Sequence, residues 1–212
     1  MNRILATLAL TTLPTVACAE TFVADVWVDN WFEIRIDGAK VAEDSVPITT
    51  ERSFNAETFS FEAERPFTVG LVAKDFKQDD TGLEYIGTRR QQMGDGGAIV
   101  QIKDADGAIV AVSDAGWQCL PIHTAPLDPA CADEADPVAG EGACAFEASE
   151  EPEGWDAPGF DASAWPQATL YTAAQVDPKQ GYDDVEWSDR AEFIWGPDLQ
   201  RTNTVLCRLT VE

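Results

Sequence analysis

The segment from residue 79 to residue 97 holds the densest group of side chains suited to gripping a ligand. It lies between two strand-like apolar runs and carries five such side chains: Tyr85, Arg89, Arg90, Gln92 and Asp95. Its glycines allow a close approach of the backbone, and the paired arginines offer rigid donors to hydroxyls or a carboxylate. We predict that this segment is a ligand-facing edge. The competing interpretation is that each arginine only neutralises surrounding carboxylates.

Trp31 is the second candidate for ligand contact. Residues 31–37 alternate apolar and polar side chains with the period of a half-buried strand, which puts Trp31 on one face with Glu33 and Arg35. An aromatic ring beside polar groups is a platform for the apolar face of a pyranose, whose hydroxyls need hydrogen-bond partners. The competing interpretation is that another strand or loop covers the ring, because tryptophan is highly buried on average.

Catalytic signatures are weak. His123 is the single histidine, and the chain has no G-x-S-x-G element, so a Ser-His-Asp hydrolase is unsupported and a loop histidine is expected. A glycosidase needs only two carboxylates at a defined separation. With 38 Asp+Glu, the sequence permits such a pair without marking one.

Acidic clusters raise the question of calcium, which prefers several oxygen ligands. Asp79 and Asp80 are weak candidates, and the same holds for two clusters farther along the chain, Asp133-Glu134-Asp136 and Asp183-Asp184. Solvated negative surface is the default interpretation of such groups. We therefore expect no certain cofactor, with Ca²⁺ as the one cation worth testing.

The charge balance excludes some partners. The 212 residues include 14 Lys+Arg and 38 Asp+Glu, a formal net charge of −24. Phosphate binding needs clustered lysine and arginine, so nucleic acid and anionic lipid surfaces would be repelled. The excess is uneven, since no basic residue lies between Lys103 and Lys179, a stretch with fifteen carboxylates. We expect a neutral glycan, or an acidic one that Ca²⁺ bridges or that Arg89 and Arg90 meet.

Residues 1–19 have the features of a signal peptide. Arg3 gives a positive start, an apolar stretch covers residues 4–16, and an A-x-A cleavage motif ends at Ala19. We predict cleavage after Ala19 and a secreted or periplasmic product. The alternative is a lipoprotein with a lipid on Cys18, although its sequence box lacks the usual leucine. No later run approaches the ~20 apolar residues of a membrane span.

Four cysteines follow the predicted leader, an even number in an oxidising compartment, and so predict two disulfides. Three pairings are open. We favour Cys131–Cys144, which closes a loop rich in proline, glycine and alanine, with Cys119–Cys207 tying two strands together. Zinc is the weaker alternative, because the chain has no C-x-x-C pair and a single histidine.

The dominant period of the sequence is two, as in an all-β protein. Alternating stretches recur at 59–73 and 204–211, where Cys207 shares a face with apolar residues. Residues 98–103 and 108–112 flank an Asp-Gly turn and predict a β-hairpin. The same turn does not fit an EF-hand, which would need glycine at position 109 and glutamate at position 115.

These strands predict an antiparallel sandwich or barrel, with residues 20–212 as one domain. Residues 121–158 break the pattern, since they hold six of the twelve prolines, two cysteines and many acids. We predict that they form a long acidic loop pinned by a disulfide.

Three segments resemble, in order, the galactose-binding-like β-sandwich modules appended to bacterial glycoside hydrolases and sugar esterases. They are DNWFEIRIDGAKV at 29–41, GWDAPGFDASAWPQA at 154–168 and AEFIWGPDLQRTNTVLCR at 191–208. The resemblance implies a jelly-roll sandwich with a carbohydrate-related role. The chain departs from the pattern at Ala162, where an aspartate is preferred, and at Phe193, where a tryptophan is expected. Because the matching elements of that family mostly hold loops together, the resemblance assigns no binding role to Asp29, Asn30 or Asp161.

The leading hypothesis is a secreted, non-catalytic carbohydrate-binding module that contacts its glycan through the 79–97 segment and Trp31. The second hypothesis is a structural or adhesion protein of the cell envelope with a protein partner. The third is a hydrolase that works through two carboxylates. The sequence leaves the oligomeric state open.

Overall fold

A computed structural model describes residues 19–49 and 54–212 of the chain. Apart from Ala19, the predicted signal peptide and the lipoprotein box at Cys18 lie outside these residues. Within the described residues, no helix has the length and apolar character needed to cross a membrane.

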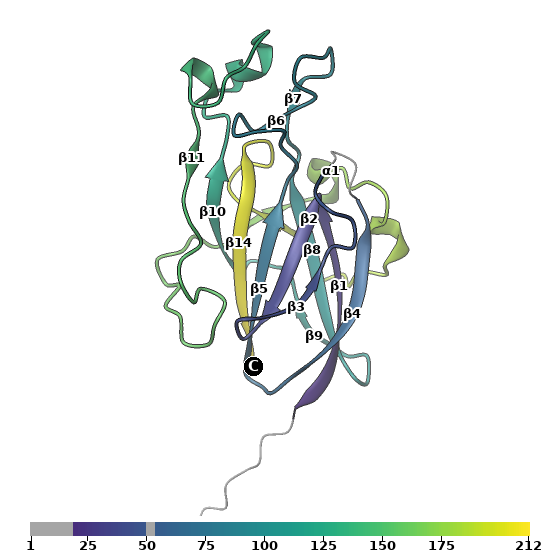
Figure 1. Cartoon of the computed structure of the whole chain (residues 1–212). Helices are drawn as coiled ribbons and strands as arrows, with labels where there is room; N and C mark the ends of the chain where they lie inside the picture. The colour runs from purple at the N-terminus through teal and green to yellow at the C-terminus, as the bar shows by residue number, and fades with distance from the viewer. Residues whose placement is uncertain (1–18, 50–53) are drawn as a thin grey trace, which may run out of the picture.

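Two antiparallel sheets make up the protein (Figure 1). The first has the order β12 (Thr169–Tyr171), β13 (Phe193–Trp195), β8 (Gly97–Asp104), β1 (Glu20–Asp29) and β4 (Ala56–Ala63), with β9 (Ile109–Val112) paired to β8. The second has the order β11 (Glu147–Ala148), β10 (Gln118–Thr124), β14 (Thr202–Val211), β5 (Phe67–Lys74), β2 (Trp31–Ile36) and β3 (Ala39–Glu43). The remaining elements are short: the hairpin strands β6 (Leu83–Glu84) and β7 (Gln92–Met93), the helix α1 (Ala173–Val176), and the 3₁₀ turns η1 (Pro129–Asp133), η2 (Gly142–Cys144) and η3 (Tyr182–Asp184).

The core lies between the two sheets and follows from the alternation in the sequence. In β2, the odd side chains are half-buried and the even ones, Phe32, Ile34 and Ile36, are buried. They pack in one cluster with residues from the opposite sheet such as Val26 and Val100. Burial of one face of each sheet is what a period of two provides. The predicted all-β antiparallel sandwich is therefore confirmed, while the jelly-roll strand order stays a prediction.

Loops cover parts of both outer faces of the sandwich. Trp27 and Ile99, on the outer face of the first sheet, pack with Val176 and Phe193. On the second sheet, Trp155 packs against Val72 and Leu206. These apolar contacts explain why strands such as β1 and β5 are buried on both faces in part of their length.

Both predicted disulfides are confirmed. Cys119 and Cys207 are direct partners in the pairing of β10 with β14, and they join these strands across 88 residues of sequence. Cys131–Cys144 joins η1 to η2 across a sequence separation of 13. The inward position predicted for Cys207 also holds, because the residue is buried in the main core.

The hairpin predicted at the Asp-Gly turn is present as β8 and β9, with Gly107 in the left-handed region at a φ of 81°.

The acidic loop predicted at 121–158 begins later than expected. Residues 121–124 continue β10, where Pro121 is followed by a shift of register against β14. A proline is tolerated at such an irregularity because the regular ladder, which needs its missing N–H, is interrupted there. The loop also contributes a buried side chain, Trp155, so part of it covers the sheet.

Candidate functional site

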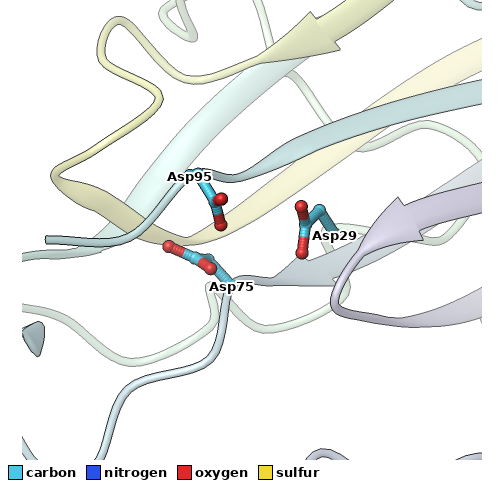
Figure 2. A group of neighbouring side chains, drawn as sticks. All are labelled: Asp29, Asp75 and Asp95. Atoms are coloured by element: carbon cyan, nitrogen blue, oxygen red, sulfur yellow. The ribbon is translucent and has the colours of Figure 1, made fainter. Parts of the chain in front are cut away.

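Three aspartates meet at one end of the sandwich. Asp29 is the last residue of β1, Asp75 follows directly after β5, and Asp95 stands two residues before β8. Each offers one carboxylate oxygen, and these three oxygens lie within 4.8 Å of one another. Figure 2 shows the three carboxylates facing a common space from three separate segments. Within residues 19–49 and 54–212, this is the one group of three or more acidic, histidine or cysteine side chains with such spacing.

Backbone hydrogen bonds fix the strand ends that carry the aspartates. The Asn30 amide donates to the Lys74 carbonyl at 2.8 Å, and the Asp75 amide donates to the Asn203 carbonyl at 2.9 Å. The Asn30 side chain accepts a hydrogen bond from the Phe76 amide at 2.6 Å. These bonds fix the backbone at Asp75 and at Asn30, the residue after Asp29, and so fix the positions of both aspartates.

Gly94 explains how the third segment comes so close. A Cβ atom at this position would lie 1.7 Å from a carboxylate oxygen of Asp75, so only glycine leaves room for that side chain. Gly96 is similar, since its Cβ would lie 2.5 Å from the ring of Trp195. Both glycines make room for a neighbouring side chain of the protein itself, and the ligand-facing role predicted for the 79–97 segment stays a prediction.

Burial dominates the electrostatics of the group. Asp29 is 0% exposed and Asp75 is 2% exposed. Burial, reinforced by the charge of Asp95 and opposed by Lys179, raises the pKa of Asp29 to about 8. Burial, together with the charges of Asp29 and Asp95, raises the pKa of Asp75 well above its usual range. Neither oxygen of Asp75, nor Oδ1 of Asp29, has a hydrogen-bond partner among the described residues.

Lys179 supplies the positive charge of the site. Its Nζ lies 3.2 Å from Oδ2 of Asp29 and 2.5 Å from Oδ2 of Asp95. Burial alone would lower the pKa of Lys179, but the two carboxylates outweigh it and raise the pKa above its ordinary value. The residue lies in the loop after α1, two residues beyond the C-cap Asp177, which adopts the left-handed conformation.

A hollow of about 320 Å³ opens beside this group. Seven side chains line it: Phe54, Glu84, Tyr85, Gln92, Asp95, Lys179 and Gln180. Asp95 and Lys179 belong both to the hollow and to the aspartate group, so the two features form one site. Its lining combines two aromatic rings with two amides, two carboxylates and one ammonium group.

The hairpin of β6 and β7 positions the hollow's wall. Gln92 donates from Nε2 to Glu84 at 3.0 Å across the hairpin. Tyr85 adopts a φ of 52°, which is uncommon for a residue with a side chain, and its carbonyl accepts from the Thr88 amide at 3.1 Å. The Arg90 guanidinium lies 4.1 Å from the centre of the Tyr85 ring. The tyrosine is therefore held between a tight turn and a stacked cation.

The residues singled out in the sequence divide between different places. Tyr85, Gln92 and Asp95 line the hollow. Arg90 acts behind Tyr85, and Arg89 lines a separate depression beside the acidic loop.

Trp31 does not line the hollow, and its ring lies on the outer face of the second sheet. Its ring packs against the cluster of Val72, Trp155 and Leu206, with the Lys74 ammonium 4.9 Å from the ring centre. The ring is half-buried by this loop and strand packing. Trp31 is therefore not part of the hollow that Tyr85, Gln92 and Asp95 line.

The predicted calcium candidates Asp79 and Asp80 have local partners. Oδ1 of Asp79 accepts hydrogen bonds from the amide and hydroxyl of Thr81, which closes a turn. Asp80 pairs with Lys77 at 2.5 Å and lies 3.2 Å from Nε2 of His123. The expected loop position of His123 is wrong, because the residue lies buried in β10, where its ring bonds to the Asn203 side chain at 2.9 Å.

Sequence reasoning missed Asp29 and Asp75 as partners, together with Lys179. The signal that was present is positional, because Asp29 and Asp75 each directly follow a run of strand residues. Comparison with known proteins adds no family assignment: no family model, curated protein or solved structure matches the chain. The site's geometry is therefore the basis for assigning a function.

Proposed function

We propose that the protein is a secreted, non-catalytic module that binds a carbohydrate in the hollow beside Asp95. The observation that carries the proposal is the lining of this hollow, in which aromatic rings stand next to amide and charged groups. Sugars need both, since the C–H face of a pyranose packs on aromatic rings while its hydroxyls must find hydrogen-bond partners. Two disulfides are compatible with an extracellular or periplasmic location.

The size of the hollow favours the end of a glycan as ligand. Its volume of about 320 Å³ is at the small end of the range for small-molecule sites. Tyr85 and Phe54 would contact the apolar face of a terminal sugar. Gln92 and Gln180 would exchange hydrogen bonds with its hydroxyls, because each amide group both donates and accepts.

The charge around the hollow favours a neutral sugar. Glu84 and Asp95 line it against one lysine, Lys179, whose ammonium is already paired with carboxylates. With a net charge of −24 on the whole chain, an acidic glycan would meet repulsion before it reached the site.

Carboxylate-based hydrolysis receives less support from the same residues. Such a reaction needs two carboxyl groups that reach the scissile bond from either side. Of the two carboxylates that line the hollow in the described chain, Glu84 is 2% exposed, and the side chain of Asp95 is 39% exposed. The raised pKa of Asp29 would suit a general acid, but Asp29 is fully buried beneath Lys179.

The test is a panel of neutral and acidic glycans, followed by titration of the best ligand. We expect Tyr85→Ala and Gln92→Ala to weaken binding about tenfold or more, which corresponds to about 1.4 kcal/mol. Gln92 is exposed, so its loss should leave the fold intact. Gln200→Ala is the matched control, because Gln200 is also exposed and does not line the hollow. Absence of saturable binding to every glycan, with and without Ca²⁺, would refute the proposal.

A further inference from the structure

The three aspartates at the strand ends carry an inference that does not depend on the carbohydrate. We propose that Asp29, Asp75 and Asp95 form a Ca²⁺ site, and that the Lys179 ammonium takes the place of the ion when Ca²⁺ is not bound. Four independent features support it: the spacing of the oxygens, the state of Asp75, the position of Lys179 and the opening to the hollow.

The spacing of the oxygens suits calcium. Ca²⁺ binds oxygen ligands at about 2.3–2.6 Å, so two ligands of one ion stand at most about 5 Å apart. The three carboxylate oxygens lie within 4.8 Å of one another, which meets that limit without a change of backbone. Ca²⁺ also accepts direct coordination by several carboxylates, whereas Mg²⁺ usually keeps several of its waters and is held by one or two carboxylates. A group of three converging carboxylates therefore suits the larger ion.

The buried, unpartnered side chain of Asp75 points to a ligand, and this evidence is separate from the clustering of the three aspartates. Its side chain is buried, faces the space between the three carboxylates, and has no hydrogen-bond partner on either oxygen among the described residues. A buried carboxylate without partners is costly, and metal coordination is one of the few arrangements that relieve the cost. A bound cation would give both Asp75 and the unpartnered Oδ1 of Asp29 a partner.

Lys179 shows that the space between the carboxylates accepts a cation. Its Nζ contacts Asp29 and Asp95, while no ion pair within residues 19–49 and 54–212 reaches Asp75. If all four groups were charged, three carboxylates and one ammonium would leave two negative charges. A divalent ion that replaced the ammonium would satisfy all three carboxylates rather than two.

The hollow provides the way in and the remaining ligands. Asp95 and Lys179 line it, and the side chain of Asp95 is 39% exposed. Ca²⁺ takes six to eight oxygens, so water in the hollow would complete the shell left open by the three aspartates. Withdrawal of the Lys179 side chain into this space would uncover the site without movement of the strands.

The experiment measures binding of Tb³⁺, a luminescent substitute for Ca²⁺, and its displacement by Ca²⁺ at physiological ionic strength, with no glycan present. Trp195 packs against Gly96, next to Asp95, and provides an indole close to the site for sensitised emission. We expect saturable emission that Ca²⁺ reverses, and a rise in Tm with Ca²⁺. No saturable binding at up to about 10 mM Ca²⁺, above the weak range for extracellular modules, would overturn the proposal.

Variants locate the bound ion. Asp75→Asn keeps the shape of the side chain, and we expect it to weaken Ca²⁺ binding at least tenfold. Asp95→Asn should do the same, and the exposure of Asp95 protects this second variant from a failure to fold. The control is Asp136→Asn, which removes the same charge from an exposed position of the acidic loop and should bind as the wild type does. Unchanged affinity in both site variants would overturn the proposal.

Lys179→Met tests the exchange of lysine for calcium. Without the competing ammonium, this variant should bind Ca²⁺ about tenfold more tightly than the wild type. Equal or weaker binding would contradict the role given to Lys179. Since these titrations contain no glycan, their failure leaves the carbohydrate proposal standing, and failure of the glycan panel leaves the calcium site standing.

Discussion

Two aspartates of the same strand show how much the partners of a residue decide its chemistry. Asp25 and Asp29 both belong to β1, and both are buried. Burial would raise the pKa of Asp25, but hydrogen bonds from Thr58, Lys103 and Gln101 outweigh it and lower the pKa below 3.8. Asp29 contacts one cation, Lys179, but its burial and the charges of Asp95 and Glu84 raise its pKa. Asp25 is therefore a structural anion, whereas Asp29 is one of the proposed ligands of a divalent cation.

Asp25 gives a prediction about stability in acid. Because its pKa is lower in the folded than in the unfolded protein, the stability it adds is present above about pH 4 and is lost as pH falls through the folded pKa. Asp25→Asn should therefore lower the free energy of unfolding at pH 7 by about 1–3 kcal/mol and flatten its fall in acid. Urea unfolding between about pH 2.5 and pH 7, a range that spans the usual aspartate pKa, measures both effects.

The control for this prediction is Asp106→Asn, at an exposed position of the β8–β9 turn. Its curve should follow that of the wild type. A wild-type pH dependence in Asp25→Asn would show that the hydrogen bonds to Asp25 add no pH-dependent stability.

At the scale of elements, the second disulfide supports the wall of the hollow. Leu83 of β6 packs in one buried cluster with Cys131 and Cys144, and Met93 of β7 contacts the same cluster. The Gln91 side chain donates to two carbonyls of the acidic loop at 2.9 and 2.8 Å. The loop pinned by this disulfide is thus the base on which the β6–β7 hairpin rests.

This arrangement predicts different effects for the two disulfides. Replacing Cys131 and Cys144 by serine opens a short loop and should speed hydrogen exchange about tenfold or more in residues 83–93, with weaker glycan binding. Replacing Cys119 and Cys207 by serine removes a link between residues 88 positions apart in the sequence. This change should lower the free energy of global unfolding by about 4–5 kcal/mol on the chain-entropy model. Native-state hydrogen exchange, read by mass spectrometry, distinguishes the two. Wild-type exchange in the hairpin of the first variant would contradict its dependence on the loop.

The elements themselves could largely be predicted from the sequence. Alternation identified β2 and β14, the Asp-Gly turn identified the β8–β9 hairpin, and the cysteines identified both disulfides. These are local signals, or signals limited to a few pairings. The short strands β6 and β7 were missed because two residues are too few to show a period.

The site was only half predictable, for a physical reason. Tyr85, Gln92 and Asp95 stood out because they are close together in the sequence. Asp29 and Asp75 join them only because β1 and β5 end at the same end of the sandwich, and strand order is a long-range property that no local pattern records. Lys179 arrives from a loop more than eighty residues beyond Asp95, and its role follows from its two ion pairs.

At the scale of the whole molecule, the candidate site occupies one end of the sandwich. Figure 1 shows β6, β7 and α1 at the end opposite to the C-terminus. The outer faces of both sheets are partly covered, since Val176 of α1 packs on Trp27 of the first sheet and Trp155 of the acidic loop packs on Val72 and Leu206 of the second. The strand ends leave the hollow open between the hairpin and the loop that holds Lys179.

On the proposed function, the glycan binds in the hollow at the strand ends rather than on the outer sheet face that carries Trp31. The most direct test is a ¹H–¹⁵N NMR titration with the best ligand of the glycan panel, which follows side-chain amides and indole groups at once. We predict that the signals of Gln92 and Gln180 shift in a saturable way, while the Trp31 indole stays unchanged. Saturable shifts of the Trp31 indole, with Gln92 and Gln180 unmoved, would contradict the account and move the binding surface to the outer face of the second sheet.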